Sequence, residues 1–430
     1  DEEARTLLSM FLLASAKKEL SMCSFRLFGI EKPKEEEVWS TKVTDEDLEN
    51  AIEDEFGVKY SKDWKRLLKA PKNLSGKYSI RKGVKVIGDR TFFLCRFLTN
   101  INIPNSVTTI GDLTFVFCDS LTSINIPNSV TTIGNWGLGA CKSLTSITIP
   151  NSVVTIIGNP FYGWHGILNN ESKAFIYEDH VLFNKNKTTL IAYIAKETNY
   201  TIPNSVTTIG EGAFSYCKSL ISINIPNSVT TIGEEAFGGC EFLVNINIPN
   251  SVTTIGRGAF GRCDSLTSIN IPNSVTTIGN WGFGACKSLT SITIPNSVVT
   301  IIGNPFKGWH GNLYNESKAF IYEDHVLFNK NKTTLIAFRA KETNYTIPNS
   351  VTTIGEEAFG GCKSLVNINI PNSVTTIGRG AFKYCNSLTN INIPNSVTAI
   401  EDGAFVNCNN ISSQIRSDII QRFGEEVFEL

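Results

Sequence analysis

Residues 348–370 read PNSVTTIGEEAFGGCKSLVNINI, and this stretch decides the fold because it recurs along the chain. An Ile-Pro-Asn tripeptide marks the copies, with its proline at Pro104, Pro127, Pro150, Pro203, Pro226, Pro249, Pro272, Pro295, Pro348, Pro371 and Pro394. Successive prolines lie 23 residues apart, except for two intervals of 53, so two units carry a 30-residue insert. A degenerate first copy begins at Arg81. The chain therefore contains twelve units over residues 81–416.

The apolar residues of one unit predict two short strands and a turn. The stretch from Leu365 to Ile370 alternates apolar and polar residues, which is typical of a strand. Pro371 cannot donate a ladder hydrogen bond and ends it. Val-Thr-Thr-Ile is a second, β-branched segment, and the glycine-rich run between the two places Phe359 and Cys362 inward. One unit cannot bury this face alone, so neighbouring units must stack at ~4.8 Å per strand. The period predicts a solenoid.

The unit resembles the BspA-like branch of the leucine-rich repeats, through Ile-Pro-Asn-Ser-Val-Thr-Thr-Ile-Gly-x-x-Ala-Phe-x-x-Cys-x-x-Leu over residues 81–416. The fold class that we expect is an α/β solenoid, mainly β: a right-handed, curved leucine-rich-repeat superhelix of about twelve repeats, with hairpin inserts and helical caps. Its parallel strands are expected to line the concave face. The resemblance also implies a surface or secreted adhesin that binds host matrix proteins or other cells.

The charge composition speaks against nucleic acid as a partner. Lys and Arg number 39 and Asp and Glu number 40, whereas nucleic-acid-binding chains normally have a basic excess. No stretch approaches the ~20 apolar residues that span a bilayer, so no membrane insertion is expected. The apolar run Leu7–Ala16 follows acidic rather than basic residues, and Lys and Glu interrupt the run before Cys23. Neither segment predicts a leader sequence.

The cysteines follow the repeat and predict buried thiols. Ten of the eleven stand at one repeat position: Cys95, Cys118, Cys141, Cys217, Cys240, Cys263, Cys286, Cys362, Cys385 and Cys408. The two long units have Trp164 and Trp309 there, so the position is a space-filling one rather than a ligand or disulfide position. No Cys-x-x-Cys pair indicates zinc. Stacking also brings neighbouring cysteines close, which leaves occasional oxidation between repeats as the alternative.

The inserts, 159–200 and 304–345, each contain the hairpin-like sequence AFIYEDHVLFNKNKTTLIA, at 174–192 and 319–337. A diverged third copy lies at 55–71, so the β region is expected to begin near residue 56. Residues 127–211 and 272–356 are copies that differ at six places: Leu138/Phe283, Tyr162/Lys307, Ile167/Asn312, Asn169/Tyr314, Tyr193/Phe338 and Ile194/Arg339. A packed core would not accept Arg or Asn for Ile without a large cost. Positions 162, 167, 169 and 194 are therefore predicted to face solvent.

The ends of the chain differ from its middle. We expect an N-terminal helical cap over 1–55, with helices at 2–20 and 44–54, the second capped by Thr44 with Asp47 at its third position. A β-hairpin module over 56–80 leads into the solenoid at 81–416. A C-terminal capping helix follows within 412–430, with one apolar face formed by Ile415, Ile419, Ile420, Phe423 and Val427.

The sequence contains little that suggests catalysis. Its four histidines are two duplicated pairs, His165/His310 and His180/His325. Glu178, Asp179 and His180 would point to alternate faces of a strand and could not share a metal ion. Nucleophile-elbow and phosphate-loop motifs are missing from the sequence. We expect no catalytic residues, no metal and no cofactor.

Two surfaces are candidates for binding a protein ligand. The first is a ladder of small polar side chains on the presumed concave strands: Asn100, Asn102, Ser123, Asn125, Ser146, Thr148, Ser222, Asn224, Asn245, Asn247, Ser268, Asn270, Ser291, Thr293, Asn367, Asn369, Asn390 and Asn392. The second is the insert surface: Tyr162, Ile167, Asn169, Ile194, Lys307, Asn312, Tyr314 and Arg339. The alternatives are that the ladder only solvates the sheet and that the insert surface drifted after duplication. The alternative function is an intracellular scaffold or regulator that docks through its acidic N-terminal helices.

Overall fold

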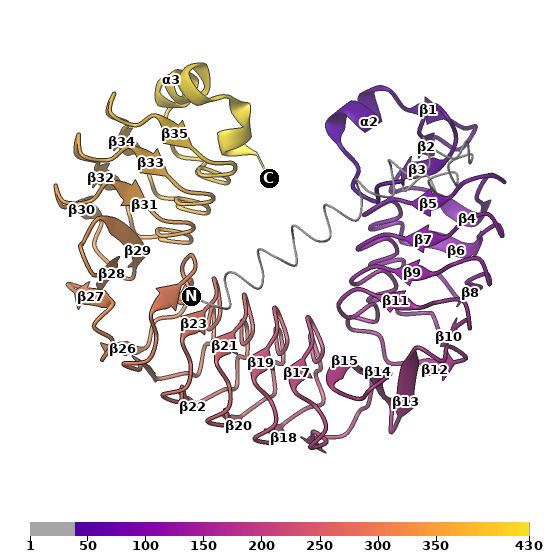
Figure 1. The fold of residues 1–430 in the computed structure, drawn as a ribbon. Coiled ribbons are helices and arrows are strands. Elements are labelled where there is room, and N and C mark those ends of the chain that lie inside the picture. The colour runs from indigo at the N-terminus through magenta and orange to yellow at the C-terminus, as the bar shows by residue number, and fades with distance from the viewer. Residues whose placement is uncertain (1–38, 430) are drawn as a thin grey trace, which may run out of the picture. The chain divides into compact units, whose positions relative to one another are not determined.

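The computed structural model describes residues 39–429 (Figure 1). The chain divides into two units, Asp1–Ser40 and Thr41–Leu430, and the second contains the entire repeat region. The helix predicted over 2–20 lies outside the described residues. The second unit is a solenoid whose coils each contribute two short strands, mainly β as the repeat predicted.

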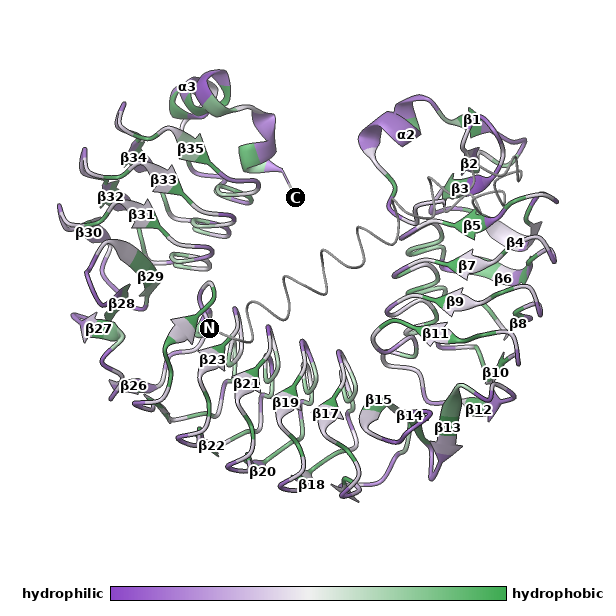
Figure 2. Cartoon of the chain, in the orientation of Figure 1, coloured by the Kyte–Doolittle hydropathy of each residue, from purple (hydrophilic) through white to green (hydrophobic). Residues whose placement is uncertain are grey.

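The first strand of a coil is formed by the β-branched Thr-Ile segment, and we call this set the Thr-Ile strands. In regular coils they are β5 (Val86–Ile87), β7 (Thr109–Ile110), β9 (Thr132–Ile133), β11 (Thr155–Ile156), β17 (Thr208–Ile209), β19 (Thr231–Ile232), β21 (Thr254–Ile255), β23 (Thr277–Ile278), β25 (Thr300–Ile301), β31 (Thr353–Ile354), β33 (Thr376–Ile377) and β35 (Ala399–Ile400). They pair in parallel with threonine opposite threonine, as in Thr231 with Thr254. Hydrophobic residues therefore recur once per coil along these sheets (Figure 2).

The second strand of a coil precedes the proline, and we call this set the ladder strands. They are β4 (Ser75–Ser79), β6 (Phe97–Asn102), β8 (Ser123–Ile124), β10 (Ser146–Ile149), β12 (Ile167–Asn170), β16 (Asn199–Thr201), β18 (Ser222–Asn224), β20 (Asn245–Asn247), β22 (Ser268–Asn270), β24 (Ser291–Ile294), β26 (Asn312–Asn315), β30 (Asn344–Thr346), β32 (Asn367–Asn369) and β34 (Asn390–Asn392). They also pair in parallel, for example Ser222 with Asn245.

Three hairpins supply additional coils. They are β1 (Ile52–Glu53), β2 (Lys59–Tyr60) and β3 (Arg66–Lys69); β13 (Phe175–Glu178), β14 (Val181–Asn184) and β15 (Thr189–Tyr193); and β27 (Phe320–Glu323), β28 (Val326–Asn329) and β29 (Thr334–Phe338). In each, the last strand pairs in parallel with the next Thr-Ile strand: β3 with β5, β15 with β17 and β29 with β31.

The inserts therefore continue the stack, and the expected number of repeats was too low. With β3, β15 and β29 added to the twelve regular Thr-Ile strands, residues 39–429 contain fifteen coils. The equivalence of 55–71 with the later hairpins was visible in the sequence. The repeat count relied on the Ile-Pro-Asn tripeptide. It therefore missed the coils in which the last strand of a hairpin takes the place of a Thr-Ile strand.

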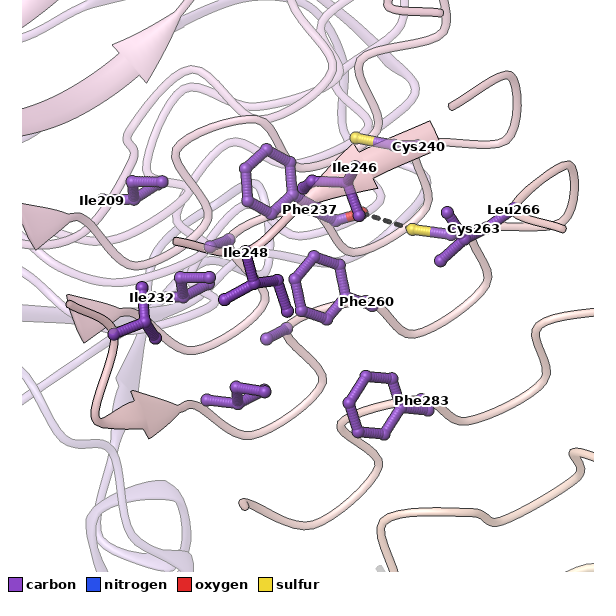
Figure 3. Close-up of a cluster of buried hydrophobic side chains, with 14 of the residues drawn as sticks. Ile209, Ile232, Phe237, Cys240, Ile246, Ile248, Phe260, Cys263, Leu266 and Phe283 are labelled. Atoms are coloured by element: carbon purple, nitrogen blue, oxygen red, sulfur yellow. Dashed lines mark hydrogen bonds between the residues drawn. The ribbon is translucent and has the colours of Figure 1, made fainter. Parts of the chain in front are cut away.

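The core contains a column of stacked side chains in which most coils contribute an aromatic ring and one contributes Leu138. Phe214, Phe237, Phe260 and Phe283 stack nearly parallel, with ring centroids 5.0, 5.5 and 5.8 Å apart. The ten repeat cysteines lie beside this column as free thiols, and all ten are buried except the half-buried Cys362. Cys263 donates through Sγ to the carbonyl oxygen of Phe237 in the preceding coil, at 3.2 Å (Figure 3). The predicted buried thiols are thus confirmed.

The turn after each Thr-Ile strand brings successive coils closest together. A Cβ on Gly134 would lie 2.4 Å from Asp112 Oδ1 and 2.6 Å from its backbone nitrogen, so this position excludes any side chain. Turn amides donate to turn carbonyls of the next coil, as Phe237 does to Ala259 at 2.8 Å. We call these bonds the turn rungs.

Within Thr41–Leu430 the stack bends toward its turns, and the ladder strands lie on its outer side (Figure 1). The expectation that these strands line the concave face was therefore wrong. The physical reason is the glycine-rich turn: the side of a coil that tolerates the closest approach becomes the inner side of the curve.

Short helices flank the described coils. α2 (Asp45–Glu49) begins at the predicted capping box, in which Asp47 N donates to Thr44 Oγ1 at 3.1 Å and Thr44 N donates to Asp47 Oδ2 at 3.0 Å. The helix predicted over 44–54 is too long, because the chain enters strand β1 at Ile52. α3 (Ser413–Phe423) ends at Gly424, earlier than expected, and the 3₁₀ turn η1 (Glu425–Phe428) follows. Phe428 extends the aromatic column, 5.5 Å from Phe405. No helix within residues 39–429 is both long and apolar enough to cross a bilayer.

Removing one ring from the column should be costly. We expect Phe260→Ala to lower the free energy of unfolding by about 3 to 5 kcal/mol, because it leaves a cavity between two stacked rings. Phe242→Ala removes the same group from an exposed site and should change it by less than about 1 kcal/mol. Urea denaturation of both variants measures the difference, and equal effects would contradict the role of the column.

Thiol reactivity should follow burial. Burial raises the pKa of Cys95, Cys141 and Cys286 to about 12, so very little reactive thiolate exists at neutral pH. A disulfide reagent should therefore label the native protein slowly at these positions and rapidly in denaturant. Half-buried Cys362 should react first among the ten repeat cysteines. Fast native labelling of most of the ten would contradict this packing.

Candidate functional site

The ladder strands present a continuous polar face. All eighteen predicted ladder residues are exposed or half-buried, because side chains in a strand alternate and the intervening isoleucines fill the core. Some ladder side chains bond along the stack: Asn100 Nδ2 donates to Ser123 Oγ at 3.0 Å, and Asn367 Nδ2 to Asn344 Oδ1 at 2.5 Å. These contacts hold neighbouring amide and hydroxyl groups one coil apart.

The structure adds residues to this face that the sequence analysis missed. Asn199 and Thr201 of β16 pair with Ser222 and Asn224 of β18, and β30 repeats the arrangement with Asn344 and Thr346. Both strands belong to insert coils, which lack the leucine of the repeat. The alternation of Asn-Tyr-Thr-Ile before the proline was the signal that could have found them.

Two strands of the insert units, β12 and β26, belong to the ladder face as well. Ile167 and Asn169 of β12 stand opposite Ser146 and Thr148, and Asn312 and Tyr314 of β26 take the same places beside β24. Ile167 is 67% exposed and Tyr314 is 56% exposed. The predicted solvent exposure of positions 167 and 169 is confirmed, and half of the predicted insert surface is one surface with the ladder.

The other insert positions lie on the turn side, and their predicted exposure was wrong. Tyr162 is only 8% exposed and Ile194 only 4%. Tyr162 stacks on Trp136 with ring centroids 4.5 Å apart and meets Tyr216 edge-on at 4.7 Å. The structure thus separates Tyr162, Ile194, Lys307 and Arg339 from the ladder face.

Arg339 shows how a covered position accepts arginine in place of isoleucine. Its guanidinium donates to the Gly311 carbonyl at 2.7 Å and to Tyr322 Oη at 3.2 Å, and it lies 4.3 Å from the centre of the Trp309 ring. Burial lowers the pKa of Arg339 from its usual value. The argument that Ile to Arg requires a solvent-facing site failed because carbonyl oxygens and a ring face surround this one.

Trp309 and Trp164 occupy the cysteine position and are buried, as predicted. Each donates through Nε1 to a backbone carbonyl, Trp164 to Leu144 at 2.6 Å and Trp309 to Leu289 at 2.7 Å. These bonds satisfy the polar atom of a large side chain in the core. Neither tryptophan is therefore available as a binding anchor.

The histidines lie in structural surroundings. Asp179 and His180 form the left-handed turn between β13 and β14, with φ of 47° and 59°, and the ring of His180 contacts Tyr177 Oη at 3.3 Å. They are turn residues rather than the strand residues that we expected. His165 is half-buried, and burial lowers its pKa. Within residues 39–429 no group of three or more His, Cys, Asp or Glu side chains is placed to hold a metal ion.

A cavity lies at each insert, and at the second insert it is lined by turn residues. The coils that contain β15 and β29 have no glycine-rich turn, so one set of turn rungs is missing there. The cavity at the first insert measures about 710 Å³ and includes Trp164, His165 and Ile194 in its wall. The cavity at the second insert measures about 1010 Å³ and includes Lys307 and Arg339.

Comparison with known proteins matches the repeats to a family model described as the BspA type leucine rich repeat region, in six copies over residues 72–174, 192–311 and 337–430. A leucine-rich repeat protein from Eubacterium ventriosum is 26% identical, with 77% of this chain and 82% of that chain covered and a TM-score of 0.43. A leucine rich cell surface protein from Faecalibacterium prausnitzii is 25% identical, with 84% and 87% covered and a TM-score of 0.42. A leucine-rich repeat protein from Bacteroides ovatus is 26% identical, with 87% and 95% covered and a TM-score of 0.32. No curated protein matches significantly.

The two copies allow a direct test of the Arg339 site. Arg339→Ile recreates the first copy, so we expect the free energy of unfolding to change by less than about 1 kcal/mol. Arg339→Glu should lower it by about 3 kcal/mol, because a carboxylate would replace the donor to the Gly311 carbonyl oxygen and would be repelled by that oxygen and by the face of the Trp309 ring. Chemical denaturation measures both changes. Equal small effects would mean that position 339 is exposed in solution.

Proposed function

The chain belongs to the BspA-type leucine-rich repeat family, and from this premise we propose that it is a non-enzymatic protein-interaction module. More narrowly, we propose an adhesin, carried at the cell surface or secreted, that binds host matrix proteins or other cells. The observation that carries the proposal is the ladder face: a long array of neutral hydrogen-bonding groups repeated at the spacing of the coils.

The ladder face is suited to a repetitive protein ligand. Its amides and hydroxyls are short side chains on a sheet, so little conformational entropy is lost when they are ordered by a partner. Each contact is weak, but contacts repeated along one rigid scaffold add through their effective concentration. The ladder residues supply the polar contacts in this proposal.

The ladder also has apolar anchors, at the two insert units. Ile167 and Tyr314 are exposed on the equivalent strands β12 and β26, two positions apart in register, and stand among small polar residues. Tyrosine is enriched among residues that dominate binding energies, because it buries a large area with few rotatable bonds. We therefore propose Tyr314 as the principal anchor of the ladder face and Ile167 as its weaker counterpart.

Truncating the anchor tests the proposal. We expect the described unit to bind at least one of immobilised fibronectin, laminin and type I collagen, and Tyr314→Ala to weaken that binding about tenfold. Phe242→Ala removes an aromatic ring of similar exposure outside the ladder strands and should leave the affinity unchanged. Surface plasmon resonance measures the affinity of the unaltered protein and of the two variants for each immobilised matrix protein.

The outcomes separate the anchor from the general function. If both single variants bind like the unaltered protein, Tyr314 is not the anchor, and substitution of Asn245, Asn247 and Asn270 by alanine then tests the ladder itself. If none of the matrix proteins is bound, and intact host cells are not bound either, the adhesin proposal is wrong.

A further inference from the structure

The cavity at the second insert, which we call the turn cleft, borders two backbone groups whose counterparts are paired elsewhere in the stack, one on the exposed Gly308 and one on the buried Gly360. In regular coils the third turn amide donates to the next coil, as Ala285 does to Lys307 and Gly361 to Lys383. The corresponding amide of Gly308 has no acceptor among the described residues, and the Gly360 carbonyl has no donor. Both residues line the cleft. The missing rung therefore leaves one donor and one acceptor for a ligand backbone.

The turn cleft is also lined by basic side chains that the first insert lacks. They are Arg257, Arg262, Lys307, Arg339, Arg379 and Lys383. The residues 145 positions earlier, at the same places around the first insert, are Asp112, Phe117, Tyr162, Ile194, Glu234 and Gly238. None of these is basic and two are acidic. Most of this positive charge is thus specific to the second site, whereas Arg262 also reaches the first, where its Nη1 donates to Tyr216 Oη at 3.1 Å.

Much of this charge has no carboxylate beside it. Lys307 Nζ lies 2.9 Å from Glu357 and Arg257 Nε lies 3.8 Å from Glu234, whereas the described residues place no carboxylate within 4.0 Å of the other four. Lys383 is half-buried beside Lys307, and burial together with that like charge lowers its pKa. Uncompensated like charges in a cavity attract an anionic ligand.

The two inserts also differ in whether the site is open. At the first insert, Tyr162 and Tyr216 fill the space between the turns with two contacting rings. At the second, Lys307 and Gly361 replace them, and no atom lies within 4 Å of the place where a Cβ on Gly361 would stand. This pair of exchanges opens the cleft, and Trp281 and Tyr384 remain in its wall.

We propose that the turn cleft binds an acidic peptide segment of a protein partner, whose carboxylates meet the basic side chains and whose backbone pairs with Gly308 and Gly360. The proposal rests on the proposed function only in taking the partner to be a protein. A densely sulfated glycan fits less well, since Glu235, Glu356 and Glu357 also line the cleft and would repel it. Peptide amides can donate to these same carboxylates.

Fluorescein-labelled decaglutamate is the probe, and its anisotropy on titration with the full chain reports binding. We expect the affinity to fall with rising salt, because the contacts are between charges. The closing variant Lys307→Tyr with Gly361→Tyr rebuilds the pair already present at the first insert, where Tyr216 adopts a positive φ of 56°. It should weaken binding at least about tenfold. Arg379→Gln with Lys383→Gln should do the same without filling the cleft.

The matched control is Tyr162→Lys with Tyr216→Gly, which opens the first site in the absence of Arg339, Arg379 and Lys383 and should not add binding. Circular dichroism and native thiol protection confirm that each variant folds. Unchanged decaglutamate binding by the folded closing variant overturns the proposal. Tighter competition by a heparin decasaccharide than by unlabelled decaglutamate would assign the cleft to a glycan instead. The Tyr314→Ala variant, whose altered residue is on the other side of the coil, should bind decaglutamate normally, so the failure of either proposal is seen separately.

Discussion

Each regular coil of the described residues hydrogen-bonds its neighbours at one spacing in three places at once: the Thr-Ile strand, the ladder strand and the turn. Parallel pairing of Thr231 with Thr254, of Ser222 with Asn245 and of the turn amide of Phe237 with Ala259 all join residues one coil apart. If a coil had one residue more or less, only one of these three sets of hydrogen bonds could keep its register, and the other two would be broken. This constraint explains why the 23-residue length is kept, and why identical side chains fall on one another in columns.

The same constraint determines what each position can be. At Gly134 the neighbouring turn leaves no room for a Cβ, and where columns form in the core a flat ring or a small thiol repeats without loss of contact. Ladder side chains face solvent and contact the ladder side chains of neighbouring coils, so asparagine, serine and threonine can replace one another there. The curvature follows from the difference in approach between the turn side and the ladder side.

The inserts continue the hydrogen bonds of the Thr-Ile strands and of the ladder strands but lack the turn rungs. β15 and β29 continue the Thr-Ile sheets, and β16 and β30 continue the ladder, but no turn accompanies them. The gap that results is filled by two tyrosines in one copy and left open by a lysine and a glycine in the other. Near-identical sequences thus produce one gap that aromatic rings fill and one open gap lined by basic side chains on the same scaffold.

The sequence by itself determined the solenoid, the coil length, the buried cysteine register and the outward set of ladder residues. These depend on period and local alternation, which are written in consecutive residues. It did not determine the number of coils, because β3, β15 and β29 enter the sheets without the marker tripeptide. Nor did it determine the side toward which the stack bends, or the burial of Tyr162, Ile194 and Arg339. Those properties depend on how closely turns from different coils approach and on which carbonyls and rings meet across an insert, and only the tertiary structure brings these groups together.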